Sequence, residues 1–200
     1  MIGYHFTGER LWDGRPIPLI GEWLVHDGPV VPCKCGLHAS EHPADALEYA
    51  PGPLLHRVEL EGDLLPHDSP VDKWVGRRRR ILATIDATGL LREYARWCAL
   101  QVIDRWNAPS VVRQYLETGD ESLRAAAQAT VQASAWASAW SAAWDAARAA
   151  AAWEAAAQAA ARDAARAAAR AAVAWASAWV AQRQQLATMV DAAFAEKEAT

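Results

Sequence analysis

Residues 121–200 contain neither glycine nor proline, and 38 of these 80 residues are alanine. Alanine is the strongest helix former, and the arginine, glutamine and glutamate residues that accompany it follow closely. Because nothing in the segment favours a turn, we expect it to be helical along most of its length. A single straight helix of this length would extend about 120 Å, so the positions of its tryptophans must decide between a rod and a folded bundle.

Six of the chain's 11 tryptophans lie in this segment, at Trp136, Trp140, Trp144, Trp153, Trp175 and Trp179. The first three share one face of a helix, whereas Trp153 lies about 180° away around the axis. The last two begin a new stripe, which Leu186, Val190 and Phe194 continue. Stripes that change face predict a bundle of two or three helices, with breaks near residues 145–152 and 161–172. The tryptophans would form the bundle core or, where exposed, a docking surface for self-association or a protein partner.

The first 86 residues have the alternation and the turn residues of a small α+β domain. Short strands are predicted at residues 2–6, 22–26, 54–60 and 79–85, with a short extended piece at 30–35. A helix is predicted at residues 44–50, with Ser40 as its N-cap and Pro43 in its first turn. Residues 62–70 are predicted to be a loop. In the third strand Leu54, His56, Val58 and Leu60 would share one face.

Residues 87–120 are predicted to form connecting helices. The first begins near Asp86, with Thr88 or Asp86 as its cap, and the second covers residues 111–118. Gly119 suits the left-handed position that ends a helix, and Asp120 suits the next N-cap. The predicted fold class is therefore an α+β N-terminal domain (1–86), connecting helices (87–120) and an all-α, alanine- and tryptophan-rich helical bundle (121–200).

The net charge of −4 arises entirely in residues 1–86, which carry 9 basic and 13 acidic side chains. The helical half is neutral, so it lacks the basic surface that nucleic acids require. The one basic cluster, Arg77–Arg80, is interpreted either as solvated charge on a strand or loop, or as a contact for phosphate or an acidic partner. We expect no nucleic-acid binding.

Three cysteines, an odd number, and an opening segment without a signal-peptide core predict a cytoplasmic protein. Residues 125–144 carry no charge and have the length of a membrane span. Six of these residues are polar and alanine is only marginally apolar, so we expect neither a span nor membrane association.

Cys33, Cys35, His38 and His42 form the densest group of potential metal ligands. Thiolate and imidazole are zinc ligands, and four of them can complete a tetrahedron. The spacing is cramped for a structural zinc site, so a turn with exposed histidines and one buried thiol is the competing interpretation.

Tyr4-His5-Phe6-Thr7, followed by Gly36–Ser40 and by Tyr49 on a helix, resembles the ADP-ribosyltransferases. In that family a histidine and a tyrosine hold the NAD cofactor, and a glutamate stabilises the developing positive charge on the sugar. The resemblance implies these roles for His5 and Tyr49, with Glu59 or Glu61 as the glutamate. It covers about sixty residues. The family's glutamate lies near a final strand, where residues 79–85 offer none.

A wider resemblance is to a small uncharacterised domain family of phage, prophage and bacterial genomes. It is carried by Pro32–Ser40, Asp45–Gly52, Val58–Gly62, Asp72-Lys73 and Arg79–Leu82, and it continues through Asp86–Thr88 and Glu93–Ala99. The tail resembles alanine/tryptophan repeats that follow such domains and that occur in some proteins described as immunity proteins. The resemblance supplies no catalytic residues.

The sequence contains no complete catalytic set, and its uncharged helices carry an excess of tryptophan. We therefore expect a non-enzymatic interaction or scaffold protein, associated with phage or mobile elements and without a cofactor. Its helical half would pack or self-associate, and its first domain would recognise a partner or small ligand. The alternatives are an NAD-using ADP-ribosyltransferase-like enzyme and a zinc-stabilised binding module.

Overall fold

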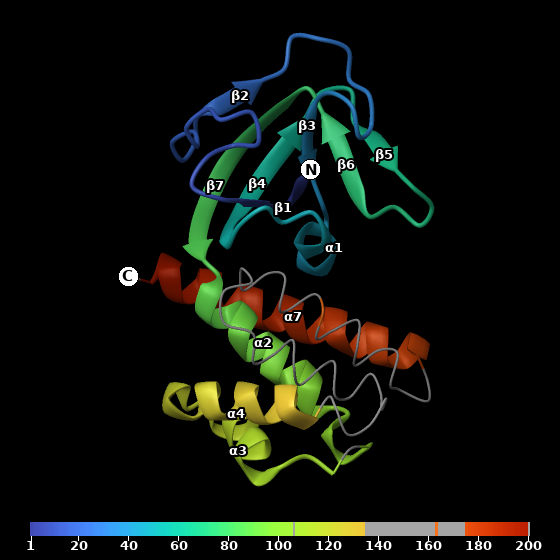
Figure 1. Cartoon of the computed structure of the whole chain (residues 1–200). Helices are drawn as coiled ribbons and strands as arrows, with labels where there is room; N and C mark the ends of the chain where they lie inside the picture. The colour runs from blue at the N-terminus through green and yellow to red at the C-terminus, as the bar shows by residue number, and fades with distance from the viewer. Residues whose placement is uncertain (106, 135–162, 164–174, 200) are drawn as a thin grey trace. The chain divides into compact units, whose positions relative to one another are not determined.

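The computed structural model describes residues 1–105, 107–134, 163 and 175–199 (Figure 1). It divides into two compact units, which are Met1–Ala87 with Leu186–Thr200, and Thr88–Gln185. The first unit is built of β-strands and one short helix, and helices follow it in the chain. The prediction of an α+β N-terminal region followed by helices is confirmed.

Two antiparallel sheets form the first unit. The four-stranded sheet has the order β1 (Ile2–Thr7), β4 (Leu54–Glu61), β7 (Arg78–Asp86) and β2 (Trp23–Val25). The three-stranded sheet has the order β3 (Leu37–Ala39), β6 (Lys73–Gly76) and β5 (Leu65–His67). The helix α1 (Pro43–Glu48) follows β3 in the chain and contacts β1.

The two sheets are joined where Tyr4 of β1 pairs with Ser40, just beyond β3. The amide of Tyr4 donates to the carbonyl of Ser40 at 2.7 Å, and the Ser40 amide donates back at 3.0 Å. A Cβ atom on Gly3 would lie only 2.6 Å from the Ser40 oxygen. Glycine at this position therefore allows the close approach of the two sheets.

The core lies on the side of β4 and β7 that faces the smaller sheet. Its apolar cluster consists of Ala39, Val58, Leu60 and Ile81. His56 is as buried as its neighbours on this face of β4. The alternation of β4 placed His56, Val58 and Leu60 correctly on one buried face, because successive side chains of a strand point to opposite faces. Leu54 is only partly buried, and Leu55 on the opposite face is fully buried.

The structure corrects several local predictions. Strands β5 and β6 lie where a loop and an unassigned segment were expected, since both are short and β5 is mostly exposed at a sheet edge. The N-cap of α1 is His42, whose Nδ1 accepts from the Ala44 amide at 3.2 Å. Ser40 does not cap the helix because it lies two residues before the N-cap position, where its backbone pairs with Tyr4. Residues 31–35 form a turn closed by hydrogen bonds between Val31 and Cys35, not an extended strand.

The C-terminal part of helix α7 (Trp175–Glu198) belongs to the first unit and contacts Tyr4 of β1 and Arg57 of β4. Its residues Leu186, Val190 and Phe194 are fully buried, as their stripe predicted. The Phe194 ring lies 6.5 Å from that of Tyr4 and 4.5 Å from the Arg57 guanidinium. The sequence assigned this stripe to a helical bundle, because periodicity shows that a face is buried without showing what buries it.

The second unit contains α2 (Thr88–Leu100), the short 3₁₀ helix η1 (Ile103–Arg105), α3 (Ser110–Thr118) and α4 (Glu121–Ser134). Gly119 ends α3 in the left-handed conformation, with φ of 68°, and Asp120 accepts from the Ser122 amide at 2.9 Å, both as predicted. The predicted breaks and the tryptophans at 136, 140, 144 and 153 lie outside the described residues. None of the helices in the described part of the chain has the length and hydropathy that crossing a membrane would need.

Candidate functional site

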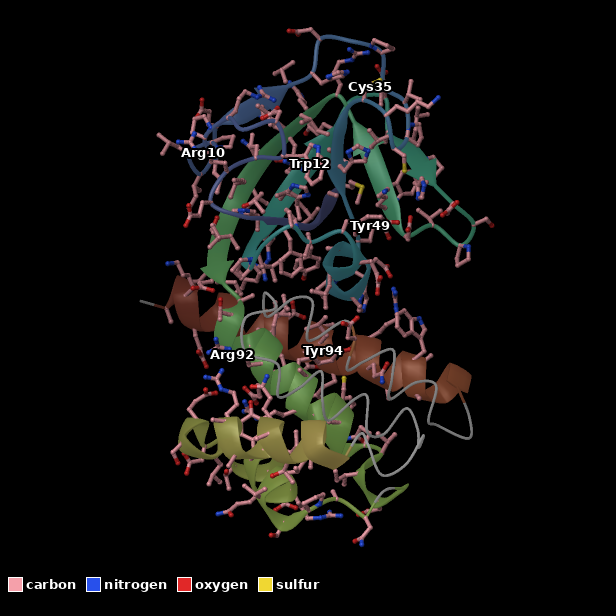
Figure 2. The ribbon with its side chains drawn as sticks, in the orientation of Figure 1. Arg10, Trp12, Cys35, Tyr49, Arg92 and Tyr94 are labelled. Atoms are coloured by element: carbon pink, nitrogen blue, oxygen red, sulfur yellow. The ribbon has the colours of Figure 1, made fainter. Side chains whose placement is uncertain are left out.

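A cavity of about 270 Å³ lies in the first unit, walled by β1, β3, β6, the end of α1 and the loop after β1. Its aromatic lining consists of Tyr4, Phe6, Trp12 and Tyr49, and its polar lining includes His5, Thr7, His38, Ser40 and Lys73. Figure 2 shows Trp12 on the loop that follows β1 and Tyr49 at the end of α1. Trp12 is 95% exposed and Tyr49 is 46% exposed, so large ring surfaces at this cavity are open to solvent.

Lys73 is the most unusual residue of the cavity, since its side chain is only 8% exposed. Its ammonium lies 3.5 Å from the centroid of the Tyr49 ring. Among the described residues no carboxylate lies within ion-pair distance of Lys73. The described residues that line the cavity include no aspartate or glutamate. The cavity therefore holds a positive charge that the described lining does not neutralise.

A hydrogen bond to Asp72 fixes the position of the Tyr49 side chain. The Tyr49 hydroxyl donates to one carboxylate oxygen of Asp72, and His67 Nδ1 lies 2.9 Å from the other. Burial raises the pKa of Tyr49, and the hydrogen bond to Asp72 raises it further. The ring that lies under the Lys73 ammonium is thus a neutral phenol in a fixed position.

Two neutral histidines form the inner wall. Burial, together with the positive charges of Lys73 and Arg79, lowers the pKa of His38 to about 4. Burial also places the pKa of His5 well below its usual value, with Arg79 acting in the same direction. The Nε2 atom of His38 is buried and has no hydrogen-bond partner among the described residues. Both imidazoles are therefore uncharged near pH 7 and have hydrogen-bonding capacity for a ligand.

A third histidine, His56, supports the wall without lining it. Its two ring nitrogens each lie 2.8 Å from a threonine hydroxyl, those of Thr7 and Thr84. Burial, together with the positive charge of Arg79, lowers the pKa of His56 to about 4. Because both nitrogens are satisfied, we assign His56 a structural role that fixes Thr7 in the cavity wall.

These geometric features lie within one recognisable segment of the chain. A domain of unknown function, DUF7666, covers residues 1–93. The DUF7666 domain includes every described residue that lines the cavity, from Tyr4 to Lys73. Comparisons with curated proteins and with solved structures found no match.

The resemblance to ADP-ribosyltransferases named His5, Tyr49 and Glu59, and the DUF7666 domain brings the first two together in this cavity. Glu59 is not with them. In the β1–β4 register His5 is opposite His56, three residues before Glu59, so the two side chains point to opposite faces of the sheet. Glu59 instead accepts from Arg80 Nε at 2.6 Å, and Glu61 accepts from Arg78 Nε at 2.8 Å.

The proposed zinc ligands are dispersed within the DUF7666 domain. Cys33 is exposed at the cavity, Cys35 is partly buried, His38 lies on β3 and His42 caps α1. In the described residues the only group of three potential ligands within 4.8 Å of one another is His67, Asp68 and Asp72. The structure therefore does not bring three of the four predicted ligands together.

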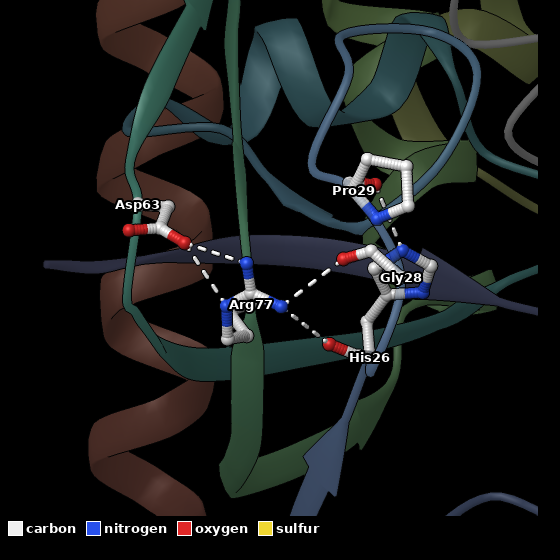
Figure 3. Close-up of polar contacts among 5 residues, drawn as sticks. All are labelled: His26, Gly28, Pro29, Asp63 and Arg77. Atoms are coloured by element: carbon white, nitrogen blue, oxygen red, sulfur yellow. Dashed lines mark hydrogen bonds and ion pairs between the residues drawn. The ribbon is translucent and has the colours of Figure 1, made fainter.

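The side chains of the arginine run, Arg77–Arg80, make contacts within the domain. Figure 3 shows Arg77 donating to Asp63 and to the carbonyls of His26 and Gly28, which fastens the loop after β2 to the turn after β4. Arg78 and Arg80 pair with Glu61 and Glu59, and their guanidinium groups lie 4.7 and 4.8 Å from the Trp23 ring centroid. Arg79 points to the other face and donates to the His38 carbonyl at 2.5 Å.

Sequence reasoning missed Trp12, Lys73 and Arg79 as site residues. Trp12 lies in an irregular loop, and Lys73 begins a strand that was not predicted, so no periodicity marked either residue. Arg79 was visible only as one member of a basic cluster. The signal that could have separated it is strand alternation, which places Arg79 opposite in orientation to Arg78 and Arg80.

Proposed function

We propose that the DUF7666 domain of this chain binds a small ligand that combines a flat aromatic ring with negative charge, such as a nucleotide. The single observation that carries this proposal is Lys73, a buried cation at a cavity whose described lining is free of acidic side chains. Asp72, which does not line the cavity, interacts electrostatically with Lys73 but forms no ion pair with it. Burying a charge is costly, and a ligand anion inside the cavity would offset that cost.

The aromatic side chains that line the cavity support the proposal that the ligand contains a flat ring. Trp12 and Tyr49 line the cavity, and Trp12 is almost fully exposed whereas Tyr49 is about half exposed. Stacking of a base on an aromatic side chain contributes about 1–3 kcal/mol. The cavity volume of about 270 Å³ is near the lower end of the range for small-molecule sites, which favours a ligand of mononucleotide size.

The test is a calorimetric titration of the full chain with each of the four ribonucleoside monophosphates. We expect at least one of them to bind, and we expect Lys73→Met to weaken that binding at least tenfold because the ligand loses its counter-charge. Lys197→Met is the matched control, since Lys197 is an exposed lysine of the same unit. Absence of binding by the unmodified chain, or equal binding by Lys73→Met, would refute the proposal.

A second candidate is an NAD-using, ADP-ribosyltransferase-like activity, which the presence of His5 and Tyr49 in one cavity favours. It predicts NAD binding and nicotinamide release that His5→Ala abolishes. Our own expectation differs from that of the transferase: because Glu59 points to the other face of the sheet, we expect NAD to bind without release of nicotinamide. Release that depends on His5 would favour the transferase over the binding module.

The proposal agrees with the non-enzymatic interaction protein expected from the sequence. Zinc stabilisation, association with phage or mobile elements, and self-association through the tryptophans of the helical half stay predictions.

A further inference from the structure

A second cavity, of about 480 Å³, borders the same pair of histidines. It shares His5, Trp12, Cys33 and His38 with the first cavity, and it extends toward β2 and the turn at residues 33–36. His5 and His38 therefore lie between two spaces, and a ligand in the first cavity can continue into the second.

Arg79 lines this second cavity and is only 7% exposed. Its three neighbours in the arginine run each pair with a carboxylate, Arg77 with Asp63, Arg78 with Glu61 and Arg80 with Glu59. Within the described part of the chain Arg79 has no such partner, and its hydrogen bond goes to a neutral carbonyl, that of His38. Arg79 is thus a buried cation without an ion-pair partner among the described residues, as Lys73 is at the first cavity.

The other charged groups of the second cavity do not neutralise Arg79. Asp13 is its acidic lining residue, and Asp13 pairs with Arg15 at 2.6 Å, with both side chains about half exposed. Lys34, His26, His5 and His38 complete the titratable lining apart from the two cysteines. The buried end of the cavity therefore has a positive potential.

We infer that Arg79 forms a second anion subsite, so that the ligand carries two phosphate groups and belongs to the nucleoside diphosphates. This inference rests on the proposed function, which places the base and the first phosphate in the cavity of Lys73. A guanidinium group presents paired donors that match the oxygens of a phosphate, and its charge is retained even when it is buried. His5 and His38 line both cavities, and their neutral imidazoles would hydrogen-bond to the oxygen atoms that link the two phosphates.

The experiment compares the Kd of a nucleoside monophosphate with that of the corresponding diphosphate, AMP against ADP, by calorimetry on the full chain. We expect the unmodified protein to bind ADP at least tenfold more tightly than AMP. In Arg79→Gln, which keeps a hydrogen-bond donor and removes the charge, the ratio should fall to near one while AMP affinity changes by less than about threefold. Arg78→Gln, an exposed neighbour on the opposite face, should keep the ratio of the unmodified protein.

The possible failures separate the two proposals. If AMP binds and ADP binds no more tightly, the Arg79 subsite is refuted and the Lys73 site stands. Retention of the ADP preference in Arg79→Gln also refutes the subsite. If neither nucleotide binds to the unmodified chain, the proposed function itself fails. Thermal melting shows which variants fold. If Arg79→Gln does not fold, Arg79→Lys replaces it, and we expect its ratio of the AMP Kd to the ADP Kd to lie between one and that of the unmodified protein.

Discussion

The buried histidines His5, His38 and His56 have different roles, although burial lowers the pKa of all three. His56 is enclosed by Thr7 and Thr84, which satisfy both of its ring nitrogens. His38 has a buried nitrogen without a partner in the described residues, and His5 lies beside it at both cavities. Burial keeps all three neutral, but only the pair at the cavities can respond to a ligand.

The stability of the domain should depend on pH through His56. Its pKa is about 4 when folded and about 6.5 when unfolded, so between these values the unfolded chain binds a proton that the folded domain does not. The free energy of unfolding therefore decreases as the pH falls from about 6.5 toward 4, by about 1.4 kcal/mol per pH unit for this group. The stabilisation is fully present above pH 6.5.

His56→Gln tests this assignment. Glutamine can hydrogen-bond to both threonines but does not titrate, so urea unfolding between pH 7 and 4.5 should show a shallower dependence than in the unmodified protein. We expect the variant to lose about 1–3 kcal/mol at pH 7, because the fit of the ring is lost. An unchanged slope between pH 6.5 and 4.5 would contradict the account.

Secondary-structure elements were predictable where local chemistry is decisive. The alternation of β4 identified its buried face, and Gly119 and Asp120 marked the boundary between α3 and α4. Strands β5 and β6 could not be predicted, because strands of three and four residues carry too little pattern. The candidate site was predicted in part: a family resemblance pointed to His5 and Tyr49, whereas Lys73 and Arg79 derive their importance from neighbours distant in the sequence.

Helix α7 provides a test at this scale, because it contains two valines in opposite environments. Val190 is fully buried, whereas Val180 is 66% exposed. Val190→Ala should lower the free energy of unfolding by about 2 kcal/mol through the loss of two buried methyl groups. Val180→Ala should change it by less than about 0.5 kcal/mol. Equal effects of the two substitutions in urea denaturation would show that the C-terminal part of α7 does not pack as described.

In the whole molecule, the compact sheet unit takes elements from both ends of the chain, since residues from Leu186 onward join Met1–Ala87. The domain of unknown function covers only the N-terminal contribution. The sequence could not predict this arrangement, because composition separates an alanine-rich half from the rest, whereas packing places the residues from Leu186 onward in the sheet unit.

Self-association is the property that we expect of the tryptophan-rich half. Light scattering coupled to size-exclusion chromatography should give a mass above 21.8 kDa, the mass of one chain. Replacing Trp136, Trp140 and Trp144 together by alanine should lower that mass toward one chain. Trp12→Ala is the control, since this exposed tryptophan lies at the cavity. A single-chain mass for the unmodified protein would exclude self-association.

The most direct test of the binding site is a crystal structure of the full chain grown with a saturating nucleotide. We expect density for the base beside Trp12 and Tyr49 and a phosphate oxygen about 3 Å from the Lys73 ammonium. A nucleotide bound elsewhere on the chain, or a cavity without ligand density at saturating concentration, would contradict it.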